Sequence, residues 1–157
     1  MKNIDISIPV RVMDYAELTV EERHLVDEAR AASHRSYAPY SNFHVGAAIA
    51  LDNGVIVTGA NQENVAYPSG TCAERSACFY AHAQYPDAKF KAIAIAALDT
   101  SSKEVAEPIS PCGSCRQALL EYETLAGHNV EVILVGSEKI YKVLSVKSLL
   151  PLAFTEF

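Results

Sequence analysis

The stretch "FKAIAIAAL", from Phe90 to Leu98, is apolar at every position except Lys91. Runs of this kind are typical of strands buried within a sheet. A helix is predicted over about 114–125, and a second buried strand follows in "VEVILVG", residues 130–136. The succession of strand, helix and strand predicts a right-handed parallel crossover. This stretch therefore places a pair of parallel strands inside the domain.

The residues before this stretch predict further alternating elements. In "TVEE", Thr19 and Glu22 have the spacing of a capping box, and apolar residues at helical spacing extend the predicted helix over about 20–36. The runs "HVGAAIAL" and "VIVTGA", separated by Asp-Asn-Gly, predict an antiparallel hairpin. Another helix is expected to start near Cys72. We therefore predict an α/β fold, a layered α-β-α domain around a central mixed β-sheet.

Length, composition and charge limit the class of protein. With 157 residues, half of them hydrophobic, the chain is expected to form a single domain over 1–157, with 1–18 as a loosely packed N-terminal extension. A formal charge of −6 gives no basic field for nucleic acid. With neither a signal-peptide pattern nor a membrane-spanning run, we expect a cytoplasmic protein with no membrane partner. Thiols in that compartment favour metal binding or chemistry over disulfides.

Three of the four cysteines have the pattern of a metal site. Cys112 and Cys115 form a Cys-x-x-Cys turn before a predicted helix, and Cys72 lies at the start of another. Three ligands on zinc leave one tetrahedral position open, as a catalytic zinc site requires. Helix N-termini favour thiolates through their dipoles and free N–H groups. Glu74, two residues after Cys72, is placed to carry protons for water on the metal.

Other interpretations of these cysteines remain open at this point. Taken alone, "PCGSC" also fits a structural zinc corner or a redox pair. A closed four-cysteine site would need Cys78, but six residues of helix rotate it by roughly 240° from Cys72, so we expect it to pack as a small hydrophobe. His82 is about 15 Å along the same helix from Cys72. The remaining histidines have no ligand-like spacing: His24, His34, His44 and His128.

Several sequence blocks together resemble a known family. "CAE" followed by "PCGSC" resembles the zinc deaminase signature, with cysteine in place of the more common histidine. The blocks "SYAPYSNFHVGAAI", "NQENVAYPSGTCAERSA", "ISPCGSCRQAL" and "LLPLAF" are similar to those of the free-nucleoside cytidine deaminases. They occur in the order of that family between about 20 and 154. Two positions depart from the pattern, because His44 replaces a frequent proline and Gln62 a frequent aliphatic residue.

The resemblance implies one zinc ion per chain and assigns the residues around it. It implies that Glu74 is the catalytic acid and base, and that Arg75 and Arg116 offset thiolate charge near the zinc. Without that offset, three thiolates would leave Zn²⁺ with a net charge of −1 and weaken it as a Lewis acid. The zinc ligands that it implies are Cys72, Cys112 and Cys115.

The resemblance also implies how a substrate would be held. Asn61 and Glu63, in "NQEN", would bind ribose hydroxyls, and Phe43 would lie against the base. The Ser110 carbonyl would receive the amino group of the base. The other implied substrate-contacting residues are Ala66 and Tyr67.

From these implications we expect a zinc-dependent hydrolase of pyrimidine salvage. It would convert cytidine and deoxycytidine to uridine and deoxyuridine plus ammonia, using zinc-activated water with Glu74 as the proton shuttle. Similar short, all-cysteine deaminases form homotetramers with shared active sites, and the same is expected here. Three alternatives compete: a polymer-editing deaminase, a zinc-stabilised interaction module, and a deaminase of another amino-bearing nucleoside or base.

Overall fold

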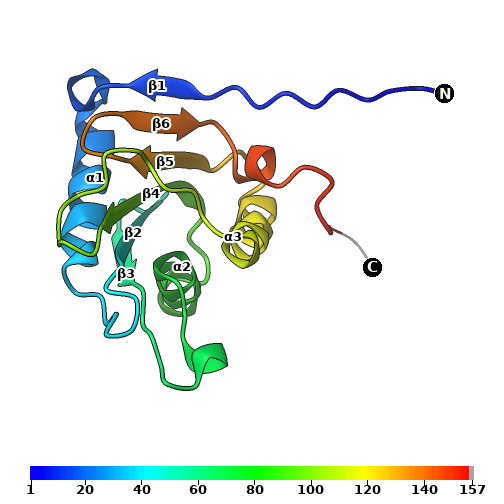
Figure 1. Ribbon diagram of the computed structural model, residues 1–157. Helices are drawn as coiled ribbons and strands as arrows, with labels where there is room; N and C mark the ends of the chain where they lie inside the picture. Colours follow the sequence, from blue (N-terminus) through cyan, green and yellow to red (C-terminus); the bar gives the residue numbers. More distant parts are fainter. Residues whose placement is uncertain (156–157) are drawn as a thin grey trace.

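The computed structural model describes residues 1–155 and has helices on both faces of one β-sheet (Figure 1). Three short 3-10 helices accompany the main elements: η1 (Tyr15–Glu17), η2 (Tyr67–Ser69) and η3 (Val146–Leu149). The three α-helices are α1 (Val20–Ser33), α2 (Ala73–Gln84) and α3 (Gly113–Ala126). The strands are β1 (Arg11–Met13), β2 (His44–Leu51), β3 (Ile56–Ala60), β4 (Phe90–Leu98), β5 (Glu131–Val135) and β6 (Ile140–Val143).

The sheet is mixed, with strand order β1-β6-β5-β4-β2-β3. β4 and β5 are parallel and are connected through α3, with Ala92 opposite Glu131. The other neighbouring strands are antiparallel, including the β2–β3 hairpin. The predicted α/β fold with a central mixed sheet is therefore confirmed, and so is the parallel arrangement of the two buried strands.

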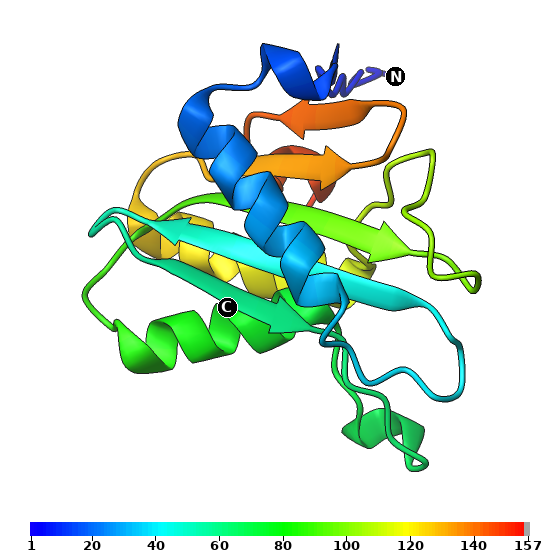
Figure 2. The same cartoon turned by 90° about the vertical axis from the view of Figure 1, so that its left-hand side faces the viewer.

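The alternation of large and small residues in β4 matches the two faces of the sheet. Ile93 and Ile95 are fully buried in the core shared with α2 and α3, while Ala94 lies in the core shared with α1. Figure 2 shows α1 crossing one face of the strands, with α2 and α3 behind them. Gly46 on β2 allows this close approach, because a Cβ there would lie 2.2 Å from the carbonyl oxygen of Ala29 on α1. Small residues thus bring α1 close to the sheet.

A second close contact places α2, which carries part of the cysteine cluster. A Cβ on Gly59 in β3 would lie 2.5 Å from the main-chain nitrogen of Ala77 and 2.7 Å from the carbonyl oxygen of Ala73. The first two turns of α2 therefore pack directly on the backbone of β3. Any side chain at residue 59 would displace the helix that positions the cysteine site.

The first helix begins as predicted but ends earlier. Thr19 Oγ1 accepts a hydrogen bond from Glu22 N (3.2 Å), and Glu22 Oε2 accepts one from Thr19 N (2.8 Å), so the predicted capping box is present. α1 ends at Ser33, three residues before the predicted end. Beyond it the backbone tightens into turns and Tyr37 bridges to Gln62, so pairing with a distant segment replaces further helix.

The N-terminal 18 residues do not share one environment. Residues 1–10 are exposed and have no regular secondary structure, whereas β1 pairs with β6 and Leu18 is buried in the core. Neither β1 nor β6 was predicted from the sequence. Among residues 1–155, no helix has the length and apolar character needed to span a membrane.

Candidate metal centre and adjoining pocket

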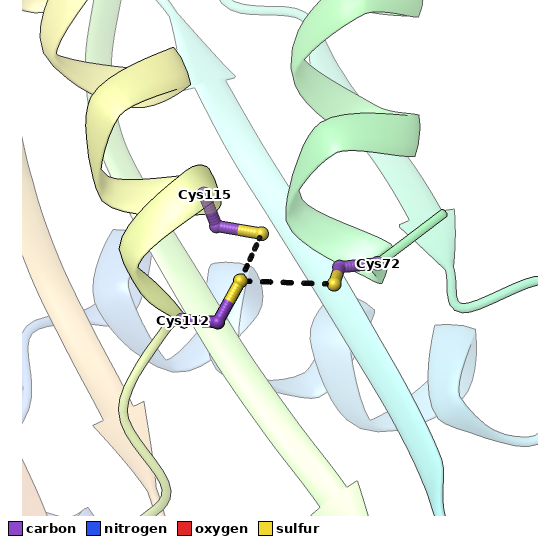
Figure 3. A group of neighbouring side chains, drawn as sticks. All are labelled: Cys72, Cys112 and Cys115. Carbon is purple, nitrogen blue, oxygen red and sulfur yellow. Dashed lines mark hydrogen bonds between the residues drawn. The ribbon is translucent and has the colours of Figure 1, made fainter. Parts of the chain in front are cut away.

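Three cysteine sulfurs meet where α2 and α3 begin (Figure 3). Cys72 is the N-cap residue of α2, Cys112 is that of α3, and Cys115 lies in the first turn of α3. Sγ of Cys112 is 3.9 Å from Sγ of Cys72 and 3.5 Å from Sγ of Cys115, and all three sulfurs lie within 4.8 Å of one another. Thiolate sulfur is a preferred zinc ligand, so the donor set fits this metal.

The surroundings of Cys72 favour negative charge on its sulfur. Arg75 Nη2 donates a hydrogen bond to Cys72 Sγ at 3.8 Å. The pKa of Cys72 is lowered to about 5, mainly by hydrogen bonding from Cys115, with Arg75 and Cys112 adding to the effect and burial opposing it. Within residues 1–155, Arg75 Nε is the only buried side-chain nitrogen or oxygen without a hydrogen-bond partner. A donor left unpaired beside three thiols is consistent with a site built for a bound group.

Glu74 is buried beside the cluster, in the first turn of α2. Glu74 is only 5% exposed. Burial raises the pKa of this carboxyl group, and negative charge on Cys72 raises it further. A buried carboxyl group with a raised pKa can serve as a proton donor as well as a proton acceptor. The structure therefore places an acid–base group next to the candidate metal ligands.

A pocket of about 540 Å³ opens beside the cluster. It brings five of the predicted site residues to one cavity: Asn61, Glu63, Tyr67, Cys72 and Arg75. Six further lining residues were not predicted: Tyr40, Ser41, Gln62, Asn64, Gly70 and Thr71. The volume is within the range of small-molecule sites.

Glu63 is held at the pocket wall by the loop that precedes β2. Its Oε2 accepts hydrogen bonds from Tyr40 N (2.8 Å) and Ser41 N (3.2 Å), and its Oε1 accepts one from the Ser41 hydroxyl. The pKa of Glu63 is lowered, chiefly by the bond from the Ser41 hydroxyl. The carboxylate is therefore charged and fixed in direction. Tyr40 and Ser41 lie in a block that resembles the family, but only folding reveals their contact with Glu63.

Asn61 bridges the pocket and the start of β2. Its Oδ1 accepts a hydrogen bond from Val45 N (2.7 Å), and its Nδ2 donates one to the carbonyl oxygen of Phe43 (2.9 Å). The amide therefore fixes the backbone on both sides of His44. Phe43 itself is half-buried and is not among the residues that line the pocket. Its predicted contact with a base stays a prediction.

The remaining predicted site residues lie around the pocket and the turn before α3. Ala66 donates its main-chain N–H to Asn64 Oδ1 (2.9 Å), and Ser110 is exposed just before Pro111. Neither Ala66 nor Ser110 lines the pocket of this single chain. Their implied contacts with substrate stay predictions.

Arg116 connects the turn before α3 to the C-terminal region. Its Nε donates to the carbonyl oxygen of Pro111 and its Nη1 to that of Leu149, both at 2.7 Å. These bonds hold the backbone next to Cys112 against η3. Of the two arginines expected to act on sulfur, Arg75 makes the direct contact, whereas Arg116 bonds to main-chain oxygens.

Cys78 is separate from the cluster, in agreement with its predicted direction on the helix. It is fully buried in the core shared by the sheet, α2 and α3. Burial raises the pKa of this thiol to about 12. His82, on the same helix, packs against the ring of Tyr122, with 5.3 Å between ring centroids. Neither residue is a fourth ligand in this arrangement.

Thiolate zinc sites that keep a coordination position for water, with a carboxyl group close by, are sites of hydrolytic chemistry. The scaffold and cluster thus define a zinc-dependent hydrolase. Residues 19–127 match the family described as "Cytidine and deoxycytidylate deaminase zinc-binding region". Because this match covers more than half of the chain, the protein belongs to that family.

Individual relatives agree with this assignment. The cytidine deaminase of Halalkalibacterium halodurans is 36% identical over 136 residues, which cover 87% of this chain and 96% of the relative. The cytidine deaminase of Sporosarcina psychrophila is 39% identical over 84% of this chain and 90% of the relative. The crystal structure of cytidine deaminase from Burkholderia pseudomallei superposes with a TM-score of 0.72 at 38% identity, over 87% of this chain and 100% of that one.

Proposed function

We propose that the protein catalyses hydrolytic deamination of cytidine and deoxycytidine to uridine and deoxyuridine, releasing ammonia, as a step of pyrimidine salvage. The observation that carries this proposal is the position of the cysteine cluster and the buried Glu74 beside a pocket lined by Asn61 and Glu63. Membership of the deaminase family supports it, as do relatives named cytidine deaminase. The single site would thus combine metal binding, proton transfer and recognition of a small polar molecule.

Cys72, Cys112 and Cys115 would hold zinc, which when bound supplies Lewis acidity and lowers the pKa of water to about 7. Glu74 accepts a proton from the water whose oxygen adds to C4 of the base. Glu74 then delivers this proton to N3 of the ring. The proton left on the added oxygen passes through Glu74 to the amino group, which departs as ammonia while the C4 carbonyl forms. This acid–base role contributes a factor of about 10²–10⁴ to the rate enhancement.

The pocket lining favours a free nucleoside over a polynucleotide. Glu63 and Asn61 would bind sugar hydroxyls, since a fixed carboxylate accepts hydrogen bonds from hydroxyl groups. Arg75 is the only Lys or Arg among the residues that line the pocket, and it bonds to sulfur. A strand-binding deaminase would need a basic track and stacking aromatic residues along the path of the strand. The overall formal charge of −6 also disfavours binding of a polynucleotide.

We also propose a homotetramer in which neighbouring subunits complete each site. Tyr67, on the pocket wall, is 76% exposed, and neighbouring Val65 is 79% exposed. Exposed apolar surface beside a ligand pocket is typical of a surface that a neighbouring subunit covers. A cytoplasmic location is proposed as well, because all four cysteines are free thiols.

The direct test uses zinc-loaded protein with cytidine, deoxycytidine, cytosine and adenosine, followed by absorbance and product chromatography. We expect turnover of the two cytosine nucleosides, with uridine or deoxyuridine and ammonia formed in equal amounts. Cytosine and adenosine should react far more slowly. Adenosine turnover without cytidine turnover would reassign the substrate, whereas absence of any deamination would overturn the proposed reaction.

A further inference from the structure

Residues 4–12, "IDISIPVRV", have the period-two pattern of a strand with one apolar face. The apolar residues are all exposed, with exposed fractions between 39% and 86%: Ile4, Ile6, Ile8, Val10 and Val12. Only the end of this pattern is paired, because β1 begins at Arg11. We call residues 1–10 the N-terminal arm. Its sequence is suited to a sheet, yet within residues 1–155 it pairs with no strand.

The N-terminal arm continues from an open edge of the sheet. β1 is the first strand in the sheet order, so its outer edge has no strand beside it within the described chain. The arm also precedes the part of the chain that matches the deaminase family, which begins at residue 19. In Figure 1 it runs outward from β1, past the end of β6. An exposed edge with apolar side chains is a template for another strand.

The two charges of the segment are unmatched within the chain. Asp5 and Arg11 take part in no ion pair among residues 1–155. Arg11 is also opposite Lys142 in the β1–β6 register, which places two cations side by side. Lys142 is already paired with Glu22 and Glu131. Arg11 therefore has Lys142 as its cross-strand neighbour and forms no ion pair with a carboxylate among residues 1–155.

We propose that the N-terminal arm pairs antiparallel with the same arm of a second copy of this chain, across a two-fold axis at Ile8. The register that places Ile8 opposite Ile8 also places Asp5 opposite Arg11, once on each side of the axis. It places Ile4 opposite Val12 and keeps all apolar residues on one face. The segment is therefore complementary to itself in both charge and hydrophobicity, as a two-fold interface requires.

Pro9 fits this register although it has no N–H to donate. Opposing residues in antiparallel strands alternate between hydrogen-bonded and non-hydrogen-bonded pairs. If the Ile8 pair is hydrogen-bonded, Pro9 faces Ser7 in a non-hydrogen-bonded pair. The absence of an N–H on Pro9 then costs no hydrogen bond between the two arms. The missing N–H then belongs to the inner edge of the strand, facing β6. This arrangement accounts for the β1–β6 ladder starting at Arg11, after the proline.

Part of the apolar face of the arm borders a groove whose lining mixes apolar and polar residues. Ile6 and Ile8 line a groove of about 570 Å³, whose other wall includes Leu150 and Leu152. Leu152 is 94% exposed. Pairing of two arms would place their apolar face over this groove and leave Asp5 and Arg11 on the other face. The paired arms would continue the sheet through β1 and β6, which gives the two-stranded ribbon the additional strands that its stability requires.

The proposal is tested by cross-linking the full-length, zinc-loaded protein. Ile8→Cys places one thiol from each copy at the axis, where Cα atoms about 5.5 Å apart are within disulfide reach. We expect a disulfide-linked dimer on a non-reducing gel after mild oxidation. Ser7→Cys is the matched control, because Ser7 faces Pro9 of the other copy and should cross-link much less. Wild-type protein gives the background from native thiols.

Charge exchange makes the test specific for the register. Added to Ile8→Cys, Asp5→Arg should lower dimer formation about tenfold, because two attractive pairs become repulsive. Arg11→Asp should act similarly, and Asp5→Arg with Arg11→Asp should restore the yield. No cross-link at Ile8→Cys, equal yields at Ser7→Cys, or yields insensitive to the charge changes would overturn the proposal. Cytidine deamination is measured in parallel on the same proteins. Failure of the cross-link with intact deamination would then count against the arm pairing alone, and not against the proposed substrate.

Discussion

The guanidinium of Arg75 donates from Nη2 to the Sγ of Cys72 at 3.8 Å, while its Nε is buried without a partner. Arg75 therefore directs its charge at the cysteine cluster. Hydrogen bonds to ligand sulfur withdraw electron density, so they preserve the Lewis acidity of a thiolate-bound metal. We expect Arg75→Gln to lower kcat about 10–100-fold. Steady-state kinetics with measured zinc content tests this. Arg35→Gln, at an exposed arginine that bonds to Thr58, is the control and should match wild type.

Metal content should depend on three cysteines and not on the fourth. Cys112→Ser removes one of the converging sulfurs, so the purified protein should lose most of its zinc. Cys78→Ala should keep about one zinc per chain, since Cys78 is buried in the core away from the cluster. Elemental analysis of both variants provides the measurement. Equal zinc loss from the two would indicate a closed four-cysteine site.

Glu74→Gln should separate catalysis from metal binding. The amide preserves shape and hydrogen bonding but cannot accept and return a proton, so kcat should fall by about 10²–10⁴ while zinc stays bound. The loss should be similar for cytidine and deoxycytidine, because both present the same reacting ring. Single-turnover kinetics and elemental analysis on the same preparation test this. An unchanged kcat would show that Glu74 does not transfer protons in the reaction.

Glu63→Gln should act on sugar recognition. Replacing the fixed carboxylate with a neutral amide weakens the hydrogen bond to a ribose hydroxyl, so kcat/KM for cytidine should fall about 5–150-fold. The preference for cytidine over free cytosine should shrink by a similar factor. Glu121→Gln, at an exposed residue of α3, is the control. An unchanged nucleoside preference would show that Glu63 does not contact the sugar.

Stability in acid should depend on the ion pair between Glu22 and Lys142. Burial raises the pKa of Glu22, but hydrogen bonds from Lys142 and Thr19 outweigh it, so the pKa is lowered below 4.5. A lowered folded-state pKa stabilises the protein above the unfolded pKa, and this contribution disappears as pH falls through the folded pKa. Glu22→Gln should therefore lower Tm by about 2–4 °C at pH 7 and by progressively less in acid.

Thermal unfolding across a pH series measures the effect of Glu22→Gln. Glutamine can still accept the hydrogen bond of the helix cap, so the variant isolates the loss of charge. Glu21→Gln is the matched control, since neighbouring Glu21 is exposed and makes no ion pair among residues 1–155. A Tm difference that does not shrink towards low pH would contradict the ionic origin of the stabilisation.

The sequence predicted elements whose signal is local. The apolar run of β4, the Asp-Asn-Gly turn of the β2–β3 hairpin and the capping box of α1 each lie within a short window, and all are present. β1 and β6 escaped prediction because they are only three and four residues long. β1 pairs only with β6, more than a hundred residues away in the chain, and no short window contains that pairing. β6 also pairs with β5 next to it in the sequence, but four residues are too few to give a clear strand pattern.

The same distinction applies to the candidate site. The spacing of Cys112 and Cys115 and the position of Cys72 at a helix start indicate a metal site from sequence alone, because helix N-termini position the thiols. The contacts of Glu63 with Tyr40 and Ser41 depend on the loop before β2 meeting the segment that follows β3. Arg116 likewise bonds to Leu149, far along the chain. Such contacts are decided by tertiary packing, which spacing does not encode.

The pairing of β1 with β6 has a consequence for how the chain folds during synthesis. β1 leaves the ribosome before its partner strand β6, which follows only after every other strand and α-helix of the described chain. The β2–β3 hairpin, β4 and β5 can assemble earlier, because their partners are already available. The residues of β1 must therefore wait, without their partner strand, until β6 has been made. Contacts between distant parts of a chain form slowly, so attachment of β1 should be among the last steps of folding.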